Sequence, residues 1–312
     1  MEWQGIIVVD KPRGLTSHDV VDRIRRVLGC RRVGHTGTLD PEATGVLVIC
    51  LGKATRLQRF LAAHDKEYIA RIRLGFATDT YDATGKPTTP LVTSKQVSVE
   101  EIEKMIETFR GTIQQIPPMF SAKKREGRRL YKLARRGETI PRHPITVTIR
   151  EIEILPTDGS RLVVNPDGTT EVTLRVKCSA GTYVRALAHE LGEKLGCGGH
   201  LVALRRTAVG PFRLDDALPL DVLEQKAVDG TIAGWIRPLS RALPQMPAVT
   251  VTDPQKRRIV HGQPLTLTEG RETPSGSTYV RLVDQADRLI AIGEIVPEER
   301  LIRPRVVVDS AD

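Results

Sequence analysis

The sequence predicts an α+β protein in which a mixed, largely antiparallel sheet is flanked by helices and followed by a small C-terminal β-barrel. Segments in which apolar and polar residues alternate recur along the chain, as expected for strands that bury one face. Between them lie segments with apolar residues at helical spacing and capping residues at their starts. Beyond residue 245 short strands and turns dominate, which is typical of a small barrel or sandwich.

Length and charge indicate a two-domain protein with an anionic partner. The chain has 312 residues and a formal net charge of +9, with 40% hydrophobic and 27% charged residues. This length supports two domains, and the prolines at 238, 244 and 247 mark a linker between residues 1–240 and residues 245–312. The positive charge favours nucleic acid or an acidic membrane surface as the partner.

Nothing in the sequence indicates a membrane segment or a secretion signal. The longest apolar run, Val46 to Leu51, is too short to span a bilayer. The run from Ile6 to Val9 is too short for a signal-peptide core, and Glu2 replaces the usual basic start. We therefore expect a cytoplasmic protein that does not bind membranes.

Cofactor motifs are also missing from the sequence. The four cysteines contain no CxxC pair, and free thiols are expected in a cytosolic chain. Cys197 and His200 have a loosely ligand-like spacing, but no second pair accompanies them, so no metal site is expected. The segment from Gly45 to Lys53 resembles a phosphate loop, yet it has six residues between its glycines and Ala54 after the lysine. We expect no cofactor.

The first elements are a strand, a turn and a helix. Gly5 to Asp10 has the apolar composition of a short buried strand, and the Pro and Gly after Lys11 indicate a turn. On this pattern Lys11 is a solvated turn residue. Thr16 or Ser17 can cap a helix that runs to about Leu28, where Gly29 ends it.

The segment GHTGTLDPEATGVLVICL, from Gly34 to Leu51, holds the main catalytic candidate. Its Asp40 lies on a Leu-Asp-Pro turn in front of an apolar run. A carboxylate can act as a nucleophile without a metal or a cofactor. A second interpretation remains open, in which Asp40 caps a helix with Pro41 at its first position and Glu42 in its first turn.

The next segments predict packing elements. Alternation from Tyr68 to Leu74 predicts a strand with Tyr68 on the apolar face, where a tyrosine usually packs with its hydroxyl bonded. Residues 78–90 are polar and indicate a hairpin or loop. Ser98 and Glu101 form a capping box for a helix whose apolar stripe packs on the sheet.

The segment from Lys123 to Arg142 is the most basic part of the chain, with nine basic and two acidic residues. Such a self-repelling stretch is poorly ordered by itself. A solvated loop is one interpretation. We prefer an arm, within an insertion of about residues 117–142, that orders when it clamps RNA.

The following strands lead to a second catalytic candidate. Residues 145–155 and 171–178 alternate as strands, with a turn at residues 165–168 between them. If Thr182 caps the helix that follows, Arg185 lies in its first turn, where a cation opposes the helix dipole. This predicts a nearby anion such as Asp40, although a solvated Arg185 is also possible.

Together these segments resemble the TruB family of tRNA pseudouridine synthases. The resemblance is carried by four motifs in order: DKPRGLTSHDVV, GHTGTLDPEATGVL, KEY at residues 66–68 and CSAGTYVRALAHELG from Cys178. It covers the chain to about Arg206, and the tail is similar to the small PUA RNA-binding domain of these enzymes. It implies the pseudouridine synthase fold, isomerisation of uridine 55 in the T-arm loop of tRNA, no cofactor, and a monomer.

The resemblance also assigns roles to residues. Asp40 is the implied nucleophile, Tyr68 stacks on the uracil and is a candidate for handling the C5 proton, and Arg185 pairs with Asp40 and lowers its pKa. His35 is implied to take over the position vacated by the flipped base. The implied substrate-binding set is His35, Tyr183, Lys11, Leu204 and the basic-arm residues Lys123, Arg125, Arg128, Arg129, Lys132, Arg135 and Arg136. For Lys11, in the first motif, the resemblance implies a structural role or a place beside the RNA.

Three functions remain open at this stage. In the first, a uridine is flipped out of the RNA, and Asp40 attacks C6 or C1′ or assists loss of the base. In the second, the protein binds or folds tRNA without chemistry, for which the basic arm and the tail suffice. In the third, His35 serves a ribonuclease as acid or base, although no second well-placed histidine is evident.

Overall fold

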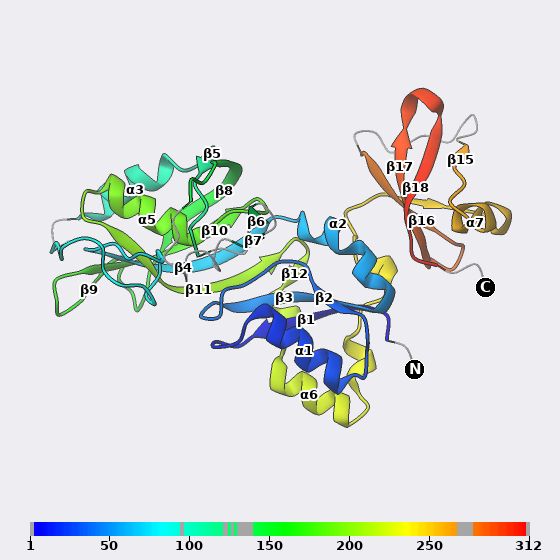
Figure 1. Cartoon of the computed structure of the whole chain (residues 1–312), viewed down its shortest axis with the longest axis horizontal. Coiled ribbons are helices and arrows are strands. Elements are labelled where there is room, and N and C mark those ends of the chain that lie inside the picture. Colours follow the sequence, from blue (N-terminus) through cyan, green and yellow to red (C-terminus); the bar gives the residue numbers. More distant parts are fainter. Residues whose placement is uncertain are drawn as a thin grey trace.

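The chain folds into a large mixed sheet with flanking helices and a smaller C-terminal sheet (Figure 1). The computed structural model describes residues 3–93, 97–120, 124–125, 128–129, 140–266 and 277–309. Most of the predicted basic arm therefore lies outside the described residues. The exceptions are residues 140–142 at its end and the backbone of a two-stranded ladder, β6 (Lys124–Arg125) with β7 (Arg128–Arg129).

The large sheet has the order β13-β1-β3-β11-β4-β10-β8-β5, and β2, β9 and β12 pair at its sides. All pairs in this order are antiparallel except β1 with β13 and β3 with β11. The predicted mixed, largely antiparallel sheet is confirmed. Its strands are β1 (Gly5–Lys11), β2 (Val33–His35), β3 (Thr44–Leu51), β4 (Lys66–Leu74), β5 (Gly111–Gln115), β8 (Ile145–Leu155), β9 (Val163–Val164), β10 (Thr170–Cys178), β11 (Gly199–Val209), β12 (Phe212–Arg213) and β13 (Leu218–Pro219).

Helices flank this sheet, and local capping explains two of their starts. Thr16 and not Ser17 caps the first helix, and Ser98 caps the third with the predicted capping box. The first helix also has a reciprocal capping box, between Thr16 and Asp19. Gly29, with a φ of 58°, follows the first helix in the left-handed conformation that glycine favours. The helical elements here are α1 (Ser17–Val27), η1 (Gly52–Leu57), α2 (Gln58–Ala62), α3 (Val99–Glu107), α5 (Val184–Lys194), η3 (Leu214–Asp216), α6 (Leu220–Val228), η4 (Ile232–Trp235) and η5 (Leu239–Arg241).

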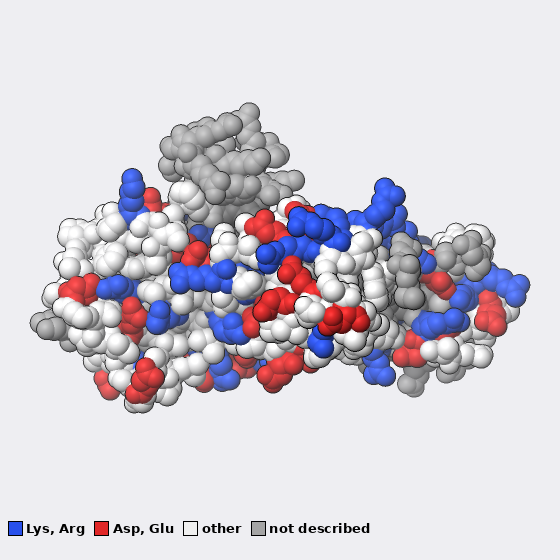
Figure 2. All heavy atoms as spheres, turned by 90° about the horizontal axis from the view of Figure 1, so that it is seen from below, with Lys and Arg blue, Asp and Glu red and all other residues white. Residues whose placement is uncertain are grey.

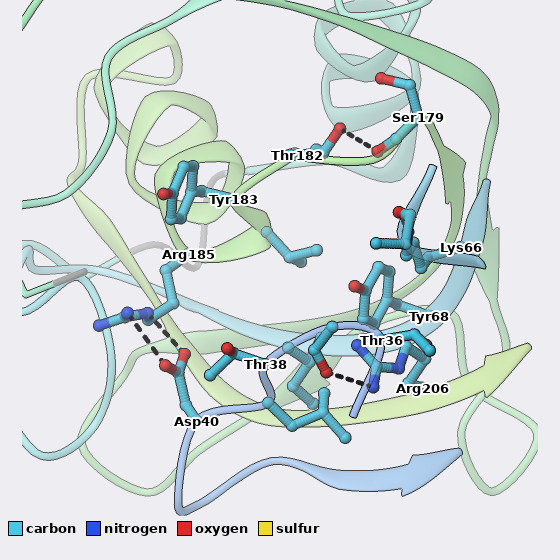
Figure 3. A pocket seen from close by; sticks show the side chains of 16 residues that line it. Thr36, Thr38, Asp40, Lys66, Tyr68, Ser179, Thr182, Tyr183, Arg185 and Arg206 are labelled. Carbon is cyan, nitrogen blue, oxygen red and sulfur yellow. Dashed lines mark hydrogen bonds and ion pairs between the residues drawn. The ribbon is translucent and has the colours of Figure 1, made fainter. Parts of the chain in front are cut away.

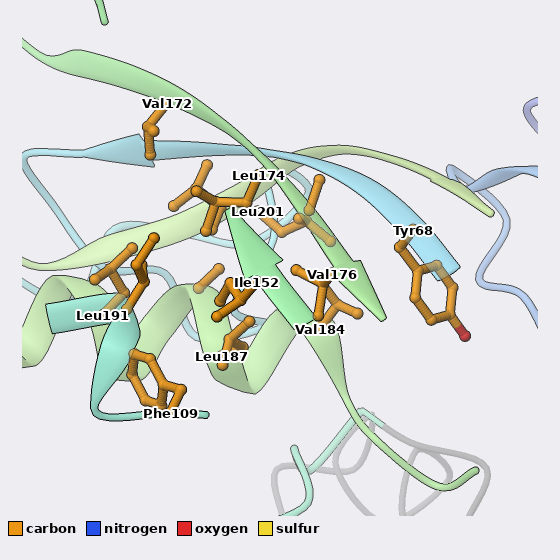
Figure 4. Packing of buried hydrophobic residues seen from close by; sticks show 14 of the residues in the cluster. Tyr68, Phe109, Ile152, Val172, Leu174, Val176, Val184, Leu187, Leu191 and Leu201 are labelled. Carbon is orange, nitrogen blue, oxygen red and sulfur yellow. The ribbon is translucent and has the colours of Figure 1, made fainter. Parts of the chain in front are cut away.

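The core beside the candidate site lies between β4, β8, β10 and β11 on one side and α3 and α5 on the other (Figure 4). The predicted alternation is confirmed: Val172, Leu174 and Val176 of β10 are buried on one face. Tyr68 of β4 lies at the edge of this cluster, and its hydroxyl points away from the apolar side chains in Figure 4. The core thus fixes the Tyr68 ring, while the hydroxyl lies outside the apolar cluster.

The other half of the sheet is covered on both faces. Side chains of α1 and α6 pack on one face of β1 and β3, while η1, α2 and the C-terminal sheet pack on the opposite face. Helix α6 was not predicted, because it starts at Leu220 without a side-chain cap and so gives little local signal in the sequence. The C-terminal sheet therefore contacts the larger part through a shared apolar cluster.

The C-terminal sheet is curled and has the order β14-β16-β17-β18-β15 (Figure 1). The predicted small β-domain is confirmed, and α7 is an addition to the expected strands and turns. The predicted linker is packed, since Ala242 and Leu243 are buried. The elements are β14 (Ala248–Thr250), α7 (Asp253–Val260), β15 (Leu265–Thr266), β16 (Tyr279–Val283), β17 (Leu289–Val296), η6 (Pro297–Glu299) and β18 (Leu301–Val307).

Within the described ranges, every helix is too short or too polar to cross a lipid bilayer.

Candidate active site

An open pocket of about 320 Å³ lies where the loop after β2 meets β4, β11 and the start of α5 (Figure 3). This volume is within the ≈300–1,000 Å³ range of ligand pockets. Five predicted site residues line it: Asp40, Tyr68, Tyr183, Arg185 and Leu204. The remaining lining residues are Thr36, Gly37, Thr38, Leu39, Ala62, Lys66, Ser179, Gly181, Thr182, Val184 and Arg206.

Asp40 and Arg185 form a two-point ion pair in the pocket wall. The Nε of Arg185 lies 2.9 Å from Oδ2 of Asp40, and its Nη2 donates to Oδ1 at 3.2 Å. The predicted contact between these residues is present, and the alternative of a solvated Arg185 is wrong because only 7% of its side chain is exposed. Such a side-on pair fixes the plane of the carboxylate as well as its position.

Asp40 lies in a turn, so the alternative in which it caps a helix is wrong. Its carbonyl accepts from the amide of Ala43 at 3.1 Å, and β3 begins at the next residue. The Asp40 side chain is 42% exposed, whereas its partner Arg185 is buried. The carboxylate is therefore held from behind and open to the pocket in front.

Arg185 is held by groups that the sequence analysis missed. Its Nη1 lies 3.2 Å from Oδ2 of Asp82 and donates to the carbonyl of Thr80 at 3.3 Å. Its Nη2 also donates to the carbonyl of Phe120 at 2.7 Å. Asp82 in turn accepts hydrogen bonds from Thr84 and Thr80. Its only sequence signal is a short Asp-Ala-Thr turn, which is common in loops.

Arg185 acts to lower the pKa of Asp40, as expected, but the net shift of this pKa is upward. Burial raises the pKa of Asp40 above its ordinary value, and the nearby Asp82 adds to this. Arg185 and Lys11 act in the opposite direction, as expected for cations, but they do not reverse the net shift in the pKa. Arg185 therefore limits a rise in the pKa of Asp40 and does not produce a net decrease.

Tyr68 lies on the floor of the pocket and is only 8% exposed. Burial raises its pKa, so the phenol is neutral in the free protein, while a hydrogen bond from Arg206 favours the phenolate. Arg206 is itself buried, and it donates to the carbonyls of Val46 at 2.7 Å and Gly37 at 3.1 Å. Arg206, which was not predicted as a site residue, ties Tyr68 to the loop that carries Asp40.

Tyr183 is the N-cap residue of α5, so the expected cap at Thr182 is wrong. Thr182 instead bonds the carbonyl of Ser179 at 2.9 Å. The buried amide of Gln115 holds Tyr183, accepting from its amide at 2.7 Å and donating to its carbonyl at 3.0 Å. Gln115 is thus another positioning residue that local sequence did not reveal.

Two predicted substrate-binding residues lie elsewhere. Lys11 was expected to be a solvated turn residue, but it is fully buried and donates to the carbonyls of Pro12 and Pro41. Burial lowers its pKa to about 8. Lys11 therefore holds the turn that follows Asp40, and its side chain is not exposed to contact RNA. His35 ends β2 and is not among the residues that line the pocket.

Two further residues shape the site: Ser17 anchors the loop before Asp40, and Lys66 adds a basic group to the pocket wall. The Oγ of Ser17 accepts from the amide of Leu39 at 2.8 Å, directly before Asp40. Lys66, 6% exposed, lines the pocket and donates to the carbonyls of Ala62 and His64. Burial lowers the pKa of Lys66 to about 8. The pocket therefore contains an ion pair at one end and two buried basic groups at the other.

The predicted RNA contacts of the basic arm stay predictions. Lys123, Lys132, Arg135 and Arg136 lie outside the described residues, and only the backbones of Arg125, Arg128 and Arg129 are described.

Solved structures of larger assemblies share this architecture. A Cbf5–Nop10–Gar1 complex gives a TM-score of 0.72 at 28% identity, covering 99% of this chain and 86% of the other. An H/ACA ribonucleoprotein bound to a substrate RNA containing 2′-deoxyuridine gives 0.71 at 27% identity, with the same two coverages. The architecture and its pocket thus define a protein with the pseudouridine synthase fold.

Family comparisons give the particular branch. Residues 25–184 match the N-terminal domain of the TruB pseudouridylate synthases, residues 185–244 the tRNA pseudouridylate synthase B C-terminal domain, and residues 247–308 the C-terminal part of pseudouridine synthase II TruB. The chain belongs to the TruB family of pseudouridylate synthases, so the expected resemblance is confirmed.

Curated relatives named tRNA pseudouridine synthase B match along the whole chain. One from Solibacter usitatus is 41% identical, covering 97% of this chain and 99% of its own length. One from Pseudomonas aeruginosa is 39% identical over 98% and 96%, and one from Bacillus cereus 38% over 99% and 99%.

Proposed function

We propose that this protein is a tRNA pseudouridine synthase that isomerises uridine 55 in the T-arm loop, with Asp40 as the nucleophile. The observation that carries the proposal is the exposed edge of the Asp40 carboxylate, held side-on by the buried Arg185 in an open pocket beside Tyr68. The whole-chain relatives named for tRNA support the choice of RNA.

The reaction breaks the C1′–N1 bond and forms a C1′–C5 bond in the same nucleotide. The C5 hydrogen leaves as a proton and N1 gains one, so the isomerisation is redox-neutral. Because the target atoms are hidden in a stacked loop, the uridine must first flip into the pocket. A pocket of about 320 Å³ with Tyr68 on its floor can receive the flipped base.

Asp40 acts in its ionised form, whether it attacks C6 or C1′ or assists loss of the base. Its carboxylate oxygens each bond to Arg185, which leaves their remaining lone pairs for the substrate. The arginine is held independently by Asp82 and two carbonyls. The nucleophile is therefore oriented before the substrate arrives, which lowers the cost of reaching the reactive geometry.

Tyr68 is the proposed stacking residue and the candidate for removing the C5 proton. Its neutral phenol is a weak base, and the Arg206 hydrogen bond is the feature that favours transient phenolate formation. Tyr183 and Leu204 border the same pocket and would enclose the base. His35, as placed at the end of β2 and outside the pocket, gives no support to a ribonuclease.

We further propose that RNA binding extends beyond the pocket. Residues 1–240 would form the catalytic domain, and residues 245–312 a PUA-like RNA-binding domain in a cytoplasmic, monomeric protein. Figure 2 shows Lys and Arg side chains gathered near the middle of one face, interspersed with acidic ones. The basic arm within residues 117–142 would supply most of the remaining phosphate contacts.

A mapping experiment tests the proposed site in the RNA. Unmodified tRNA is incubated with the protein, pseudouridine is derivatised with a carbodiimide, and primer extension locates the stop. We expect one stop at position 55, and none in a transcript with cytidine at that position. Binding without any stop would instead support the alternative, a non-catalytic RNA-binding or tRNA-folding protein.

A further inference from the structure

The loop that holds Arg185 contains a residue in an unfavourable backbone conformation. Tyr81 has a φ of 64°, in the left-handed region that residues with a Cβ seldom adopt. It lies between Thr80, whose carbonyl bonds to Arg185, and Asp82, whose carboxylate pairs with Arg185. The backbone angle at Tyr81 therefore sets the direction of both groups.

A ring stack holds Tyr81 in place. Its ring lies on the His189 ring with centroids 3.9 Å apart and planes 8° apart. His189 follows Arg185 by four residues on α5, so the two side chains share a face of the helix. The stack thus joins the loop to α5 one helical turn from the arginine that the loop supports.

The loop has other attachments, but they go to a different element. The amide of Leu201 donates to the carbonyl of Tyr81 at 3.0 Å, and the amide of Ala83 donates to the carbonyl of Leu201 at 2.9 Å. Both bonds tie the loop to β11. Together with the Arg185 bonds themselves, the Tyr81–His189 stack is what ties the described part of this loop to α5.

We propose that Tyr81 and His189 are positioning residues for the isomerisation. The stack keeps Thr80 and Asp82 on the Nη1 of Arg185, so the Nε and Nη2 edge of the guanidinium stays turned toward Asp40. Without the stack the loop relaxes toward an ordinary backbone angle, and the guanidinium loses the partners that stop it from rotating. The inference rests on the proposed function only for its kinetic consequence.

Matched variants separate the ring contact from other effects. His189→Ala and Tyr81→Ala remove the stack, while His189→Phe and Tyr81→Phe keep two aromatic rings. Tyr81→Gly accepts the φ of 64° but has no ring. We expect the single-turnover rate of C5 hydrogen release to fall by about 10- to 100-fold in both alanine variants and in Tyr81→Gly, since small misplacements of a reactive group cost that much. The phenylalanine variants should keep the wild-type rate, and RNA affinity should be unchanged in all five.

Coupling between the residues gives a second kinetic readout. The double variant Tyr81→Ala/His189→Ala should be no slower than either single variant, because both remove one stack. In an Arg185→Met background, His189→Ala should have no additional effect. Independent, multiplying losses in these pairs would overturn the proposal.

A readout that needs no activity keeps the inference separate from the proposed function. The ¹⁵N resonance of the Arg185 Nε–H, assigned by its loss in Arg185→Met, should be visible in the full-length wild type and in His189→Phe. It should broaden or vanish in His189→Ala. If this holds while the wild type releases no C5 hydrogen, the positioning role stands and the proposed function fails. An unchanged resonance and rate in His189→Ala would refute the positioning role.

Discussion

Replacement of Arg185 by methionine is the perturbation for which the structure gives the clearest magnitude. The change removes two charge-assisted hydrogen bonds to Asp40 while it keeps most of the apolar volume of the side chain. Bonds to charged groups contribute about 1.5–3 kcal/mol each. Because 42% of the Asp40 side chain is exposed, solvent screening places both hydrogen bonds at the lower end of this energy range. The expected cost is then about 3 kcal/mol, the sum of two such bonds.

This cost corresponds to about 100-fold in the single-turnover rate. The assay is C5 hydrogen release from a labelled T-arm stem-loop with enzyme in excess, with RNA affinity measured in parallel. Arg73→Met is the matched control, since it breaks the ion pair with Asp167 at the opposite end of β4 from Tyr68. We expect Arg73→Met to keep the wild-type rate. If Arg185→Met lost RNA affinity but kept its turnover per bound complex, the assigned role of Arg185 would be wrong.

Three further predictions concern charged groups at the site and in the basic arm. Burial raises the pKa of Asp40, so the single-turnover rate should fall on the acid side at a pH above the ordinary aspartate pKa of 3.8. In Arg185→Met this fall should move to still higher pH, because the cation that lowers the Asp40 pKa is gone. A shift to lower pH would contradict the assignment. Arg206→Met removes the side-chain donor from the buried bond to the Val46 carbonyl and from the part-buried bond to the Gly37 carbonyl. Denaturant unfolding should therefore show a decrease in stability of at least about 1–3 kcal/mol, the cost of the buried group. An unchanged stability would mean that these bonds contribute nothing. Deletion of residues 121–139 should weaken RNA binding. It should also reduce the slope of the log binding constant against log salt concentration by roughly 0.7–0.9 for each phosphate that the arm neutralises. An unchanged slope would mean that the arm does not touch the RNA backbone.

Much of the fold could be predicted because its signals are local. Alternation identifies β4 and β10, and the side chains of Thr16 and Ser98 complete capping boxes within four residues. The Asp40–Arg185 contact could also be predicted, from the place of Arg185 in the first turn of a helix and from the family motifs. Its residues lie 145 positions apart, and only the folded sheet brings them together.

The missed residues depend on tertiary contacts. Arg205 and Arg206 are adjacent and look alike in the sequence, but neighbours on a strand face opposite sides. Arg205 therefore pairs with Asp10, while Arg206 is buried under Tyr68. Burial of Lys11 had no local signal either, because a lysine beside a Pro-Gly turn is usually solvated.

C5 hydrogen release with variants of Asp40 tests the central claim most directly. A T-arm stem-loop labelled at C5 of the target uridine is mixed with excess full-length protein, and release is followed over a single turnover. The wild type should release the label completely, while Asp40→Asn and Asp40→Ala should bind the RNA with similar affinity and release none above background. Release by Asp40→Asn at a rate close to that of the wild type would contradict the claim that this carboxylate performs the chemistry.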